Sequence, residues 1–199
     1  MTAACLRAGY KCRLAKRPLF PEGSFLVQRE RVVHMETYQQ HGLYIIKDAY
    51  FSDFPRIGWT ANKNENRPYY YAWRDKSGIL WMIPLTSQVE NCKRKIEREE
   101  RKRGAGNCIY YHIGCIAGRE RGFKISDMFP VIDEYILRSY TIGQYTPYIV
   151  KTKSLNAALY SKSMRYLKLV ETGKIRDQLG ILPIKRILMN RIKNNCFVI

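Results

Sequence analysis

The residues best suited to chemistry in this sequence are hydroxyls and cations. Thr86 and Ser87 stand side by side directly after an apolar run, and Arg67 and Lys63 precede them in the chain. A cation can stabilise charge that develops on a phosphate in a transition state, and a hydroxyl can orient it. The Asp and Glu residues are scattered among Lys and Arg, so the clustered carboxylates of a two-metal nuclease are not indicated. Such a set can cleave RNA only if the RNA supplies its own nucleophile, the 2′-hydroxyl, which the protein holds in line.

Proton transfer to the leaving oxygen is the step for which the sequence offers least. An unassisted serine hydroxyl is too weak an acid or base, so we expect Ser87 to bind a phosphate oxygen. His112 titrates in a useful range, but it lies in an aromatic run of strand type, where a satisfied histidine of the sheet is the more common arrangement. We therefore keep His112, Lys63 and Lys93 as possible supporting residues.

A predicted β-hairpin positions the two hydroxyls. Two runs rich in aromatic and apolar residues, Tyr69–Trp73 and Ile79–Ile83, bracket a turn that contains Gly78, and this pattern is typical of a hairpin. Pro84 is expected to end the second strand, because proline cannot donate to a strand ladder. The hydroxyl pair should then follow a strand end on rigidly held backbone, a common location for functional groups.

The rest of the chain predicts an α+β fold, a compact and strongly twisted antiparallel sheet with inserted and C-terminal helices. Strand and helix patterns occur without a βαβ rhythm, which argues against a parallel sheet. Further strands are expected over residues 43–46, 108–116, 123–125 and 129–132, with a turn over 117–122. Helices are expected over 48–54, over 90–103, from Asp133, over 154–171 and over 183–193.

The formal net charge of +18 indicates an anionic partner, either nucleic acid or anionic lipid. The 15 tyrosines interleaved with cations suit unstacked RNA bases, although half-buried strand positions would also account for most of them. The polar helix over 90–103 could contact phosphates or simply be solvated. The candidate RNA-binding residues are Tyr69, Arg94, Lys95, Lys162, Arg165 and Lys168.

Cofactors and membrane insertion are not indicated. The six cysteines show no CxxC spacing, so we expect no metal site and no cofactor. No apolar run approaches the roughly 20 residues that a membrane-spanning helix needs. The start of the chain lacks the apolar core of a secretory signal, so we expect a cytoplasmic protein with reduced thiols.

Residues 1–34 differ from the remainder of the chain, residues 35–199. They are basic and show no sustained periodicity, which predicts a poorly structured extension. One interpretation is a basic arm that contacts RNA. The other, which we favour, is that the natural protein starts at Met35, because codons for Arg29–Arg31 can form a purine-rich ribosome-binding sequence. The DNA sequence over these codons would decide.

From Leu43 onward the sequence resembles the endoribonuclease toxins of type III toxin–antitoxin systems, most closely the CptN branch of the ToxN/AbiQ family. The matching segments occur in the same order as in the family. They are LYIIKDAYFSDFP (Leu43–Pro55), NENRPYYY (Asn64–Tyr71), GILWMIPLTSQVE (Gly78–Glu90) and FKISDMFPVIDEYI (Phe123–Ile136).

This resemblance implies a twisted antiparallel sheet with flanking helices, distantly like the MazF and Kid toxins. It implies metal-independent cleavage of a target RNA that leaves 2′,3′-cyclic phosphate and 5′-hydroxyl ends. It also implies a partner, an antitoxin RNA of repeated pseudoknots that the toxin processes and that assembles with it into a closed, inactive protein–RNA complex. Some members of the family abort phage infection.

Carried over by position, the resemblance assigns catalytic roles to Ser87, Thr86, Arg67 and Tyr50. Thr86 and Ser87 stand at the hydroxyl pair of the family, and Tyr50 stands at an active-site tyrosine that stacks on a base or assists proton transfer. ToxN-like members carry Lys two residues after the serine, but this chain has Val89 there. Either Arg67 alone supplies the electrostatic stabilisation, or Lys63, Lys93 or His112 replaces this lysine.

Two other functions fit the composition. A non-catalytic basic RNA-binding protein, such as a ribosome-associated factor, would have the same charge and tyrosine content, and only the resemblance separates it from a toxin. A membrane-surface protein is less well supported, because no long helix pairs a basic face with exposed aromatic residues.

Overall fold

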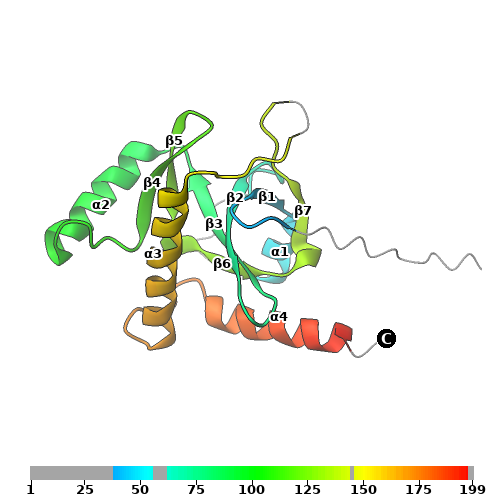
Figure 1. Ribbon diagram of the computed structural model, residues 1–199. Helices are drawn as coiled ribbons and strands as arrows, with labels where there is room; N and C mark the ends of the chain where they lie inside the picture. Colours follow the sequence, from blue (N-terminus) through cyan, green and yellow to red (C-terminus); the bar gives the residue numbers. More distant parts are fainter. Residues whose placement is uncertain (1–37, 56–61, 144–145, 197–199) are drawn as a thin grey trace, which may run out of the picture. The chain divides into compact units, whose positions relative to one another are not determined.

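The computed structural model describes residues 38–55, 62–143 and 146–196, which belong to one compact unit, Thr37–Ile199 (Figure 1). Residues 1–34, the predicted poorly structured extension, lie outside the residues that the structure describes.

Seven antiparallel strands form the sheet in this part of the chain, in the order β4-β5-β3-β2-β1-β7, with β6 paired to β3. The strands are β1 (Leu43–Ile46), β2 (Pro68–Arg74), β3 (Leu80–Thr86), β4 (Tyr111–Ile116), β5 (Arg119–Lys124), β6 (Phe129–Val131) and β7 (Ile136–Ser139). The sheet is open and flanked by helices, which confirms the predicted antiparallel α+β class.

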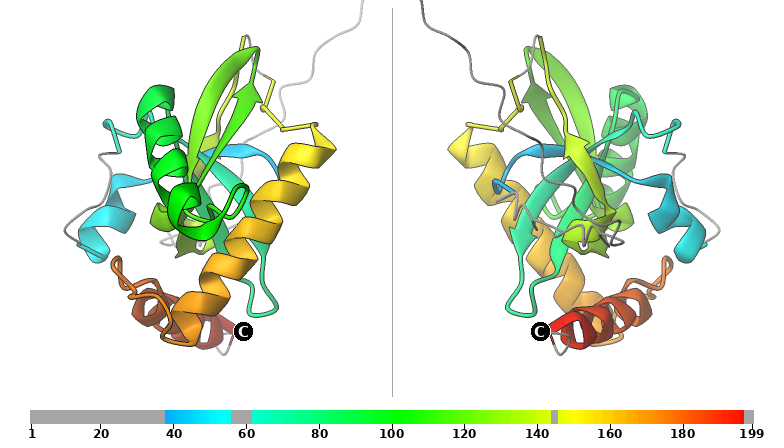
Figure 2. Two further views of the ribbon diagram at one scale, coloured as in Figure 1. Left: turned by 90° about the vertical axis from the view of Figure 1, so that its left-hand side faces the viewer. Right: turned by 90° about the vertical axis from the view of Figure 1, so that its right-hand side faces the viewer.

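The described residues form four α-helices that flank the sheet. Figure 2 shows α3 crossing the sheet diagonally, with α4 near the C-terminal end of α3. The helices are α1 (Asp48–Asp53), α2 (Val89–Arg103), α3 (Lys153–Glu171) and α4 (Ile181–Cys196), with short 3₁₀ turns η1 (Ile125–Asp127) and η2 (Asp133–Tyr135). The prediction of a helix from Asp133 is therefore wrong. Only a 3₁₀ turn forms there, because the chain enters β7 and pairs with β1.

The β2–β3 hairpin is as predicted, and Gly78 adopts the left-handed φ of 86° that its turn requires. The expected strand end at Pro84 is wrong, because β3 continues through it to Thr86. On the side opposite β2, residues up to Met82 pair with β6 and residues from Leu85 pair with β5. Pro84 lies in the gap between these partners, where a missing N–H breaks no ladder bond.

The β4–β5 hairpin is tighter than the sequence suggested. Ala117 and Gly118 have φ values of 50° and 73°, as in a two-residue type I′ turn, so the long turn expected over 117–122 does not exist. As a result β5 begins at Arg119, and its residues alternate between the two faces of the hairpin. Arg119 and Arg121 therefore share one face of the hairpin, and Lys124 lies on the other.

The core lies between the sheet and the helices and is rich in aromatic residues. Tyr69 and Phe129 pack edge to face with centroids 5.3 Å apart, and Tyr50 packs against the same Phe129 ring at 5.1 Å. Leu159 and Tyr166 of α3 are buried in the same core. None of the described helices combines the length and the apolar character that crossing a membrane would require.

Ser163 provides a test of this packing. Its side chain is fully buried on α3, and its hydroxyl has no hydrogen-bond partner among the described residues. An unsatisfied buried hydroxyl costs about 1–3 kcal/mol, and alanine is the better helix former. We expect Ser163→Ala to raise the free energy of unfolding by about 1 kcal/mol, measured by urea denaturation. The control is Ser161→Ala at an exposed position of the same helix; a loss of stability in Ser163→Ala alone would contradict this packing.

Candidate functional site: a cation-lined pocket at the end of β3

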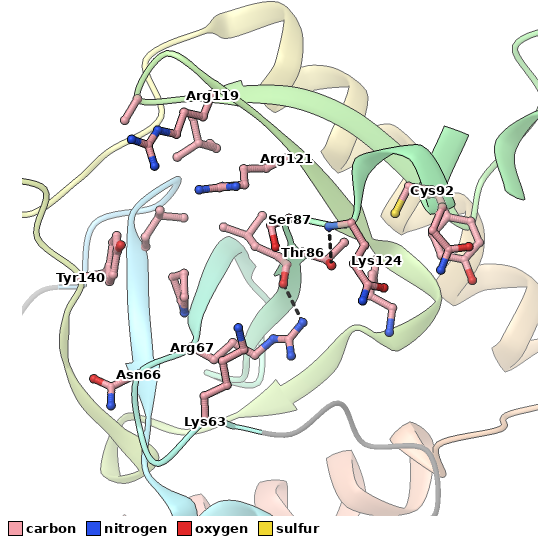
Figure 3. A pocket seen from close by; sticks show the side chains of 18 of the residues that line it. Lys63, Asn66, Arg67, Thr86, Ser87, Cys92, Arg119, Arg121, Lys124 and Tyr140 are labelled. Atoms are coloured by element: carbon pink, nitrogen blue, oxygen red, sulfur yellow. Dashed lines mark hydrogen bonds between the residues drawn. The ribbon is translucent and has the colours of Figure 1, made fainter. Parts of the chain in front are cut away.

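A pocket of about 750 Å³ lies where the end of β3 meets the β4–β5 hairpin, α2 and the turn before β2 (Figure 3). Thr86 and Ser87 line it. Within the described residues no Asp or Glu lines this pocket, whereas the lining cations are Lys63, Arg67, Lys95, Arg119, Arg121 and Lys124. A concave, carboxylate-free surface with this many cations concentrates positive potential and favours a polyanionic ligand.

The end of β3 fixes the two hydroxyls. The Thr86 Oγ1 accepts a hydrogen bond from the Gln88 N–H at 3.1 Å, and the Val89 N–H donates to the Ser87 carbonyl at 2.9 Å. These bonds turn the chain from β3 into α2. The exposed Ser87 hydroxyl makes no hydrogen bond within the described part of the chain, so it is available to a ligand.

Arg67 lines the pocket but is only 6% exposed. Its Nη2 donates to the Leu85 carbonyl at 2.7 Å, one residue before Thr86. Burial lowers the pKa of Arg67, but an arginine at this position stays charged at neutral pH. Arg67 therefore holds the end of β3 and contributes positive potential next to the hydroxyls.

Lys63 is carried by an unusual turn. Lys63, Asn64 and Glu65 have φ values of 56°, 51° and 56°, so three successive non-glycine residues adopt the left-handed conformation. Each such residue costs roughly 1 kcal/mol or more, so other contacts must hold the turn. One of them is the Glu65 Oε1, which accepts the Asp48 N–H at 2.8 Å and ties the turn to α1.

Asn62 holds the other end of this turn. Its Nδ2 donates to the Ile46 carbonyl at 2.8 Å and to Asp48 Oδ1 at 2.6 Å. Its Oδ1 accepts the Tyr69 hydroxyl at 2.9 Å, and its backbone carbonyl accepts the Arg67 N–H at 3.2 Å. This nearly buried amide links β1, α1 and β2 and so fixes the positions of Lys63 and Arg67.

Strand β5 brings a second pair of cations to the opposite wall. Thr86 pairs with Gly122, so Arg121 lies next to the end of β3 on the face opposite the Thr86 side chain, and Arg119 shares that face of the strand. Figure 3 shows Arg119 and Arg121 reaching into the pocket from the side opposite Lys63 and Arg67. A phosphate placed at Ser87 would be approached by cations from both walls.

Glycine at position 122 allows α2 to approach this wall. A Cβ there would lie 2.6 Å from Cys92 Sγ and 3.0 Å from Thr86 Cγ2. Such contacts require a neighbour to shift, so any larger residue would move α2 or the end of β3. The close approach also brings Lys95 of α2 to the pocket, where its ammonium group lies 5.1 Å from the centre of the Tyr111 ring.

Three of the predicted site residues lie elsewhere. Tyr50 is fully buried and donates its hydroxyl proton to the Pro130 carbonyl at 2.9 Å, so it cannot stack on a base in this conformation. His112 does not line the pocket, and burial lowers its pKa to about 4, which makes it neutral at pH 7. Lys93 forms ion pairs with Glu90 and Glu120 and also lies outside the pocket lining.

The candidate RNA-binding residues are also divided by the structure. Only Lys95 lines the pocket. Tyr69 is buried in the core, so its ring is not a surface for bases. The remaining candidates lie on helix surfaces away from the pocket lining and are Arg94, Lys162, Arg165 and Lys168.

Sequence reasoning missed Arg119, Arg121, Lys124 and Tyr140, which all line the pocket. The two arginines flank Glu120 in the run Arg119–Lys124, and this charged run lacks the alternation of apolar and polar residues that marks a strand. With a glycine at each end, residues 118–122 have the composition of a turn instead. Lys124 forms an ion pair with Asp127, so part of its charge is compensated.

Removal of the Asn62 amide tests how the turn is held. Asn62→Ala would leave the Tyr69 hydroxyl and the Asp48 carboxylate without this partner, and we expect a loss of about 2 kcal/mol in the free energy of unfolding. The matched control is Asn66→Ala in the same turn, whose exposed amide bonds only the Asn64 carbonyl at 2.9 Å. Equal effects of the two substitutions in chemical denaturation would contradict the assigned role of Asn62.

In the described ranges no three His, Cys, Asp or Glu side chains are grouped so that they could hold a metal ion.

Comparison with solved structures shows which known fold this is. AbiQ, a lactococcal anti-phage endoribonuclease of the type III toxin–antitoxin system, superposes with a TM-score of 0.52 at 14% identity, over 72% of this chain and 90% of AbiQ. A protein from a bacterial antiviral system regulated by a processed non-coding RNA matches at a TM-score of 0.44 and 13% identity, over 69% of this chain and 90% of its own. No family model and no curated protein sequence matches. This chain therefore has the fold of AbiQ.

Proposed function

We propose that this chain is an endoribonuclease toxin of the ToxN/AbiQ family. The observation that carries the proposal is the pocket around Thr86 and Ser87, which is lined by cations and by no carboxylate in the described residues. The AbiQ-like fold and the ordered motifs of the family support the same assignment. RNA is the substrate that fits a deep cationic pocket and also brings its own nucleophile.

In the proposed mechanism the 2′-oxygen of the substrate attacks the adjacent phosphorus, and the bond to the 5′-oxygen breaks. The products are a 2′,3′-cyclic phosphate and a 5′-hydroxyl, and the reaction requires no metal ion. Ser87 and Thr86 orient the scissile phosphate, and Arg67, bonded to the Leu85 carbonyl, adds positive potential next to them. Arg121 stabilises the charge that develops on the non-bridging oxygens. It takes the role of the lysine that ToxN-like members carry at the position of Val89.

Most of the catalytic effect is then positioning and electrostatics. The 2′-proton passes to solvent, and solvent protonates the leaving oxygen, because no histidine lines the described pocket. Lys63 and Arg119 bind the flanking phosphates from opposite walls. This division of roles predicts a slow enzyme whose rate depends steeply on the number of pocket cations.

The proposed regulator is an antitoxin RNA of repeated pseudoknots. AbiQ belongs to a type III toxin–antitoxin system, and the same arrangement would suit this chain. A polyanionic inhibitor can fill the pocket that accepts the substrate, so inhibition needs no separate regulatory site. The toxin would process this RNA into its repeats and remain bound to them in a closed complex in the cytoplasm.

The first test is the chemistry of the cut ends. We expect purified protein in EDTA to cleave single-stranded RNA into fragments with cyclic phosphate ends, detected by mass spectrometry. Ser87→Ala should abolish cleavage and leave RNA binding intact, because the serine orients a phosphate and most of the binding charge remains. A protein that binds RNA but never cuts it would support the alternative of a non-catalytic RNA-binding protein. Fragments with 5′-phosphate ends would overturn the mechanism.

The second test concerns Arg121, a pocket cation next to the end of β3. We expect Arg121→Gln to lower kcat by about 100-fold or more with little change in KM, because Arg121 acts mainly on charge in the transition state. The control is Arg138→Gln, which removes one exposed positive charge on β7 outside the pocket. Similar small losses in both variants, measured with saturating RNA, would remove Arg121 from the mechanism.

A further inference from the structure

A second cavity, of about 770 Å³, lies where α3 begins and shares no lining residue with the pocket around Ser87. We call it the α3 groove. It is bounded by the segment before β1, by the end of β2 and by the first turns of α3 (Figure 1). Both views of Figure 2 place the N-terminal end of α3 on the far side of the β4–β5 hairpin from α2.

The α3 groove carries net positive charge. Lys151 and Lys153 line it, both are exposed, and within the described residues neither forms an ion pair. No Asp or Glu lines the groove in the described ranges. A third cation, Arg74, is compensated by Asp133 at 2.8 Å. The first turn of α3 contains no acidic residue, so nothing there offsets the two lysines.

An aromatic ring stands at the edge of the α3 groove. Tyr160 is 46% exposed, and its ring packs edge-on against Trp73, with centroids 5.9 Å apart at 87°. Trp73 in turn stacks on Trp81 at 5.5 Å. Tyr160 is thus an exposed aromatic face held by a buried stack, which makes it a rigid platform for a nucleic-acid base.

The floor of the α3 groove is a fixed polar network. The Tyr70 hydroxyl donates to Asn156 Oδ1 at 2.9 Å, and the Asn156 Nδ2 donates to the Val150 carbonyl at 2.8 Å. The Tyr70 oxygen lies 2.8 Å from His41 Nδ1, which must therefore be the donor in that contact. Burial lowers the pKa of His41, so at neutral pH its second nitrogen is an acceptor in the groove.

We propose that the α3 groove is a second RNA-binding site that takes a single-stranded segment of the RNA. Lys151 and Lys153 contact successive phosphates, and a base stacks on Tyr160. Exposed cations beside a rigid aromatic face, in a concave site without acids, match the chemistry of single-stranded nucleic acid. This inference extends the proposed function, since it requires the ligand to be RNA but does not require that the RNA be cut.

The test uses a probe that cannot be cleaved. A fluorescein-labelled, fully 2′-O-methylated single strand of about 12 nucleotides has no free 2′-nucleophile and is long enough for one such site. Fluorescence anisotropy over a range of salt concentrations gives its affinity for the full chain. We expect the double variant Lys151→Gln/Lys153→Gln to bind about tenfold more weakly and to reduce the salt slope by about 1.4, at 0.7 per lost phosphate contact.

Two further variants make the result specific. Tyr160→Leu keeps an apolar contact with Trp73 but removes the stacking face, so we expect about tenfold weaker binding with an unchanged salt slope. Lys174→Gln/Arg176→Gln removes two exposed charges beyond the C-terminal end of α3 and should leave both quantities unchanged. Circular dichroism melting of each variant establishes that the fold is intact.

The outcomes separate this inference from the proposed enzyme. If Lys151→Gln/Lys153→Gln binds the probe with the affinity and salt slope of Lys174→Gln/Arg176→Gln, the α3 groove is not an RNA site, whatever the wild-type protein does to cleavable RNA. If the wild-type protein cuts no RNA but the variants behave as expected, the proposed enzyme fails and the α3 groove stands as an RNA-binding site.

Discussion

The candidate site depends on the hydrogen bond from a buried guanidinium to the last buried carbonyl of β3. Arg67 donates to Leu85 across 2.7 Å while it is almost fully removed from solvent. Burial of a charge is unfavourable unless it is paired or hydrogen-bonded, so this contact keeps both partners in place. The direct consequence is that the end of β3, with Thr86 as its last residue and Ser87 directly after it, is held in place next to a permanent positive charge.

The sheet makes this arrangement possible by changing the partner of β3 along its length. Pro84 lies between the residues of β3 that pair with β6 and those that pair with β5. The final residues of β3 therefore pair with a strand that carries arginines. Gly122 leaves room for α2 to close the same wall. Cations that are far apart in the sequence, from residue 63 to residue 124, therefore meet around one pair of hydroxyls.

Local patterns predicted much of this fold. The hairpin around Gly78 and the amphipathic helix α3 follow from turn chemistry and periodicity, and both formed where expected. The errors occurred where a long-range partner decided the outcome. Pro84 is tolerated only because of the gap between β6 and β5. The role of Arg121 depends on strand register, which residue types alone do not give.

We propose that a cationic pocket, lined by no carboxylate within the described residues, cleaves RNA by using the 2′-oxygen of the RNA itself. The most direct measurement compares one RNA substrate with the same strand carrying a single 2′-deoxy substitution at the nucleotide before the mapped cut. The account predicts that this substitution abolishes cleavage at that bond while the strand still binds and competes with the unmodified RNA. Cleavage of the deoxy-substituted bond at a comparable rate would contradict it.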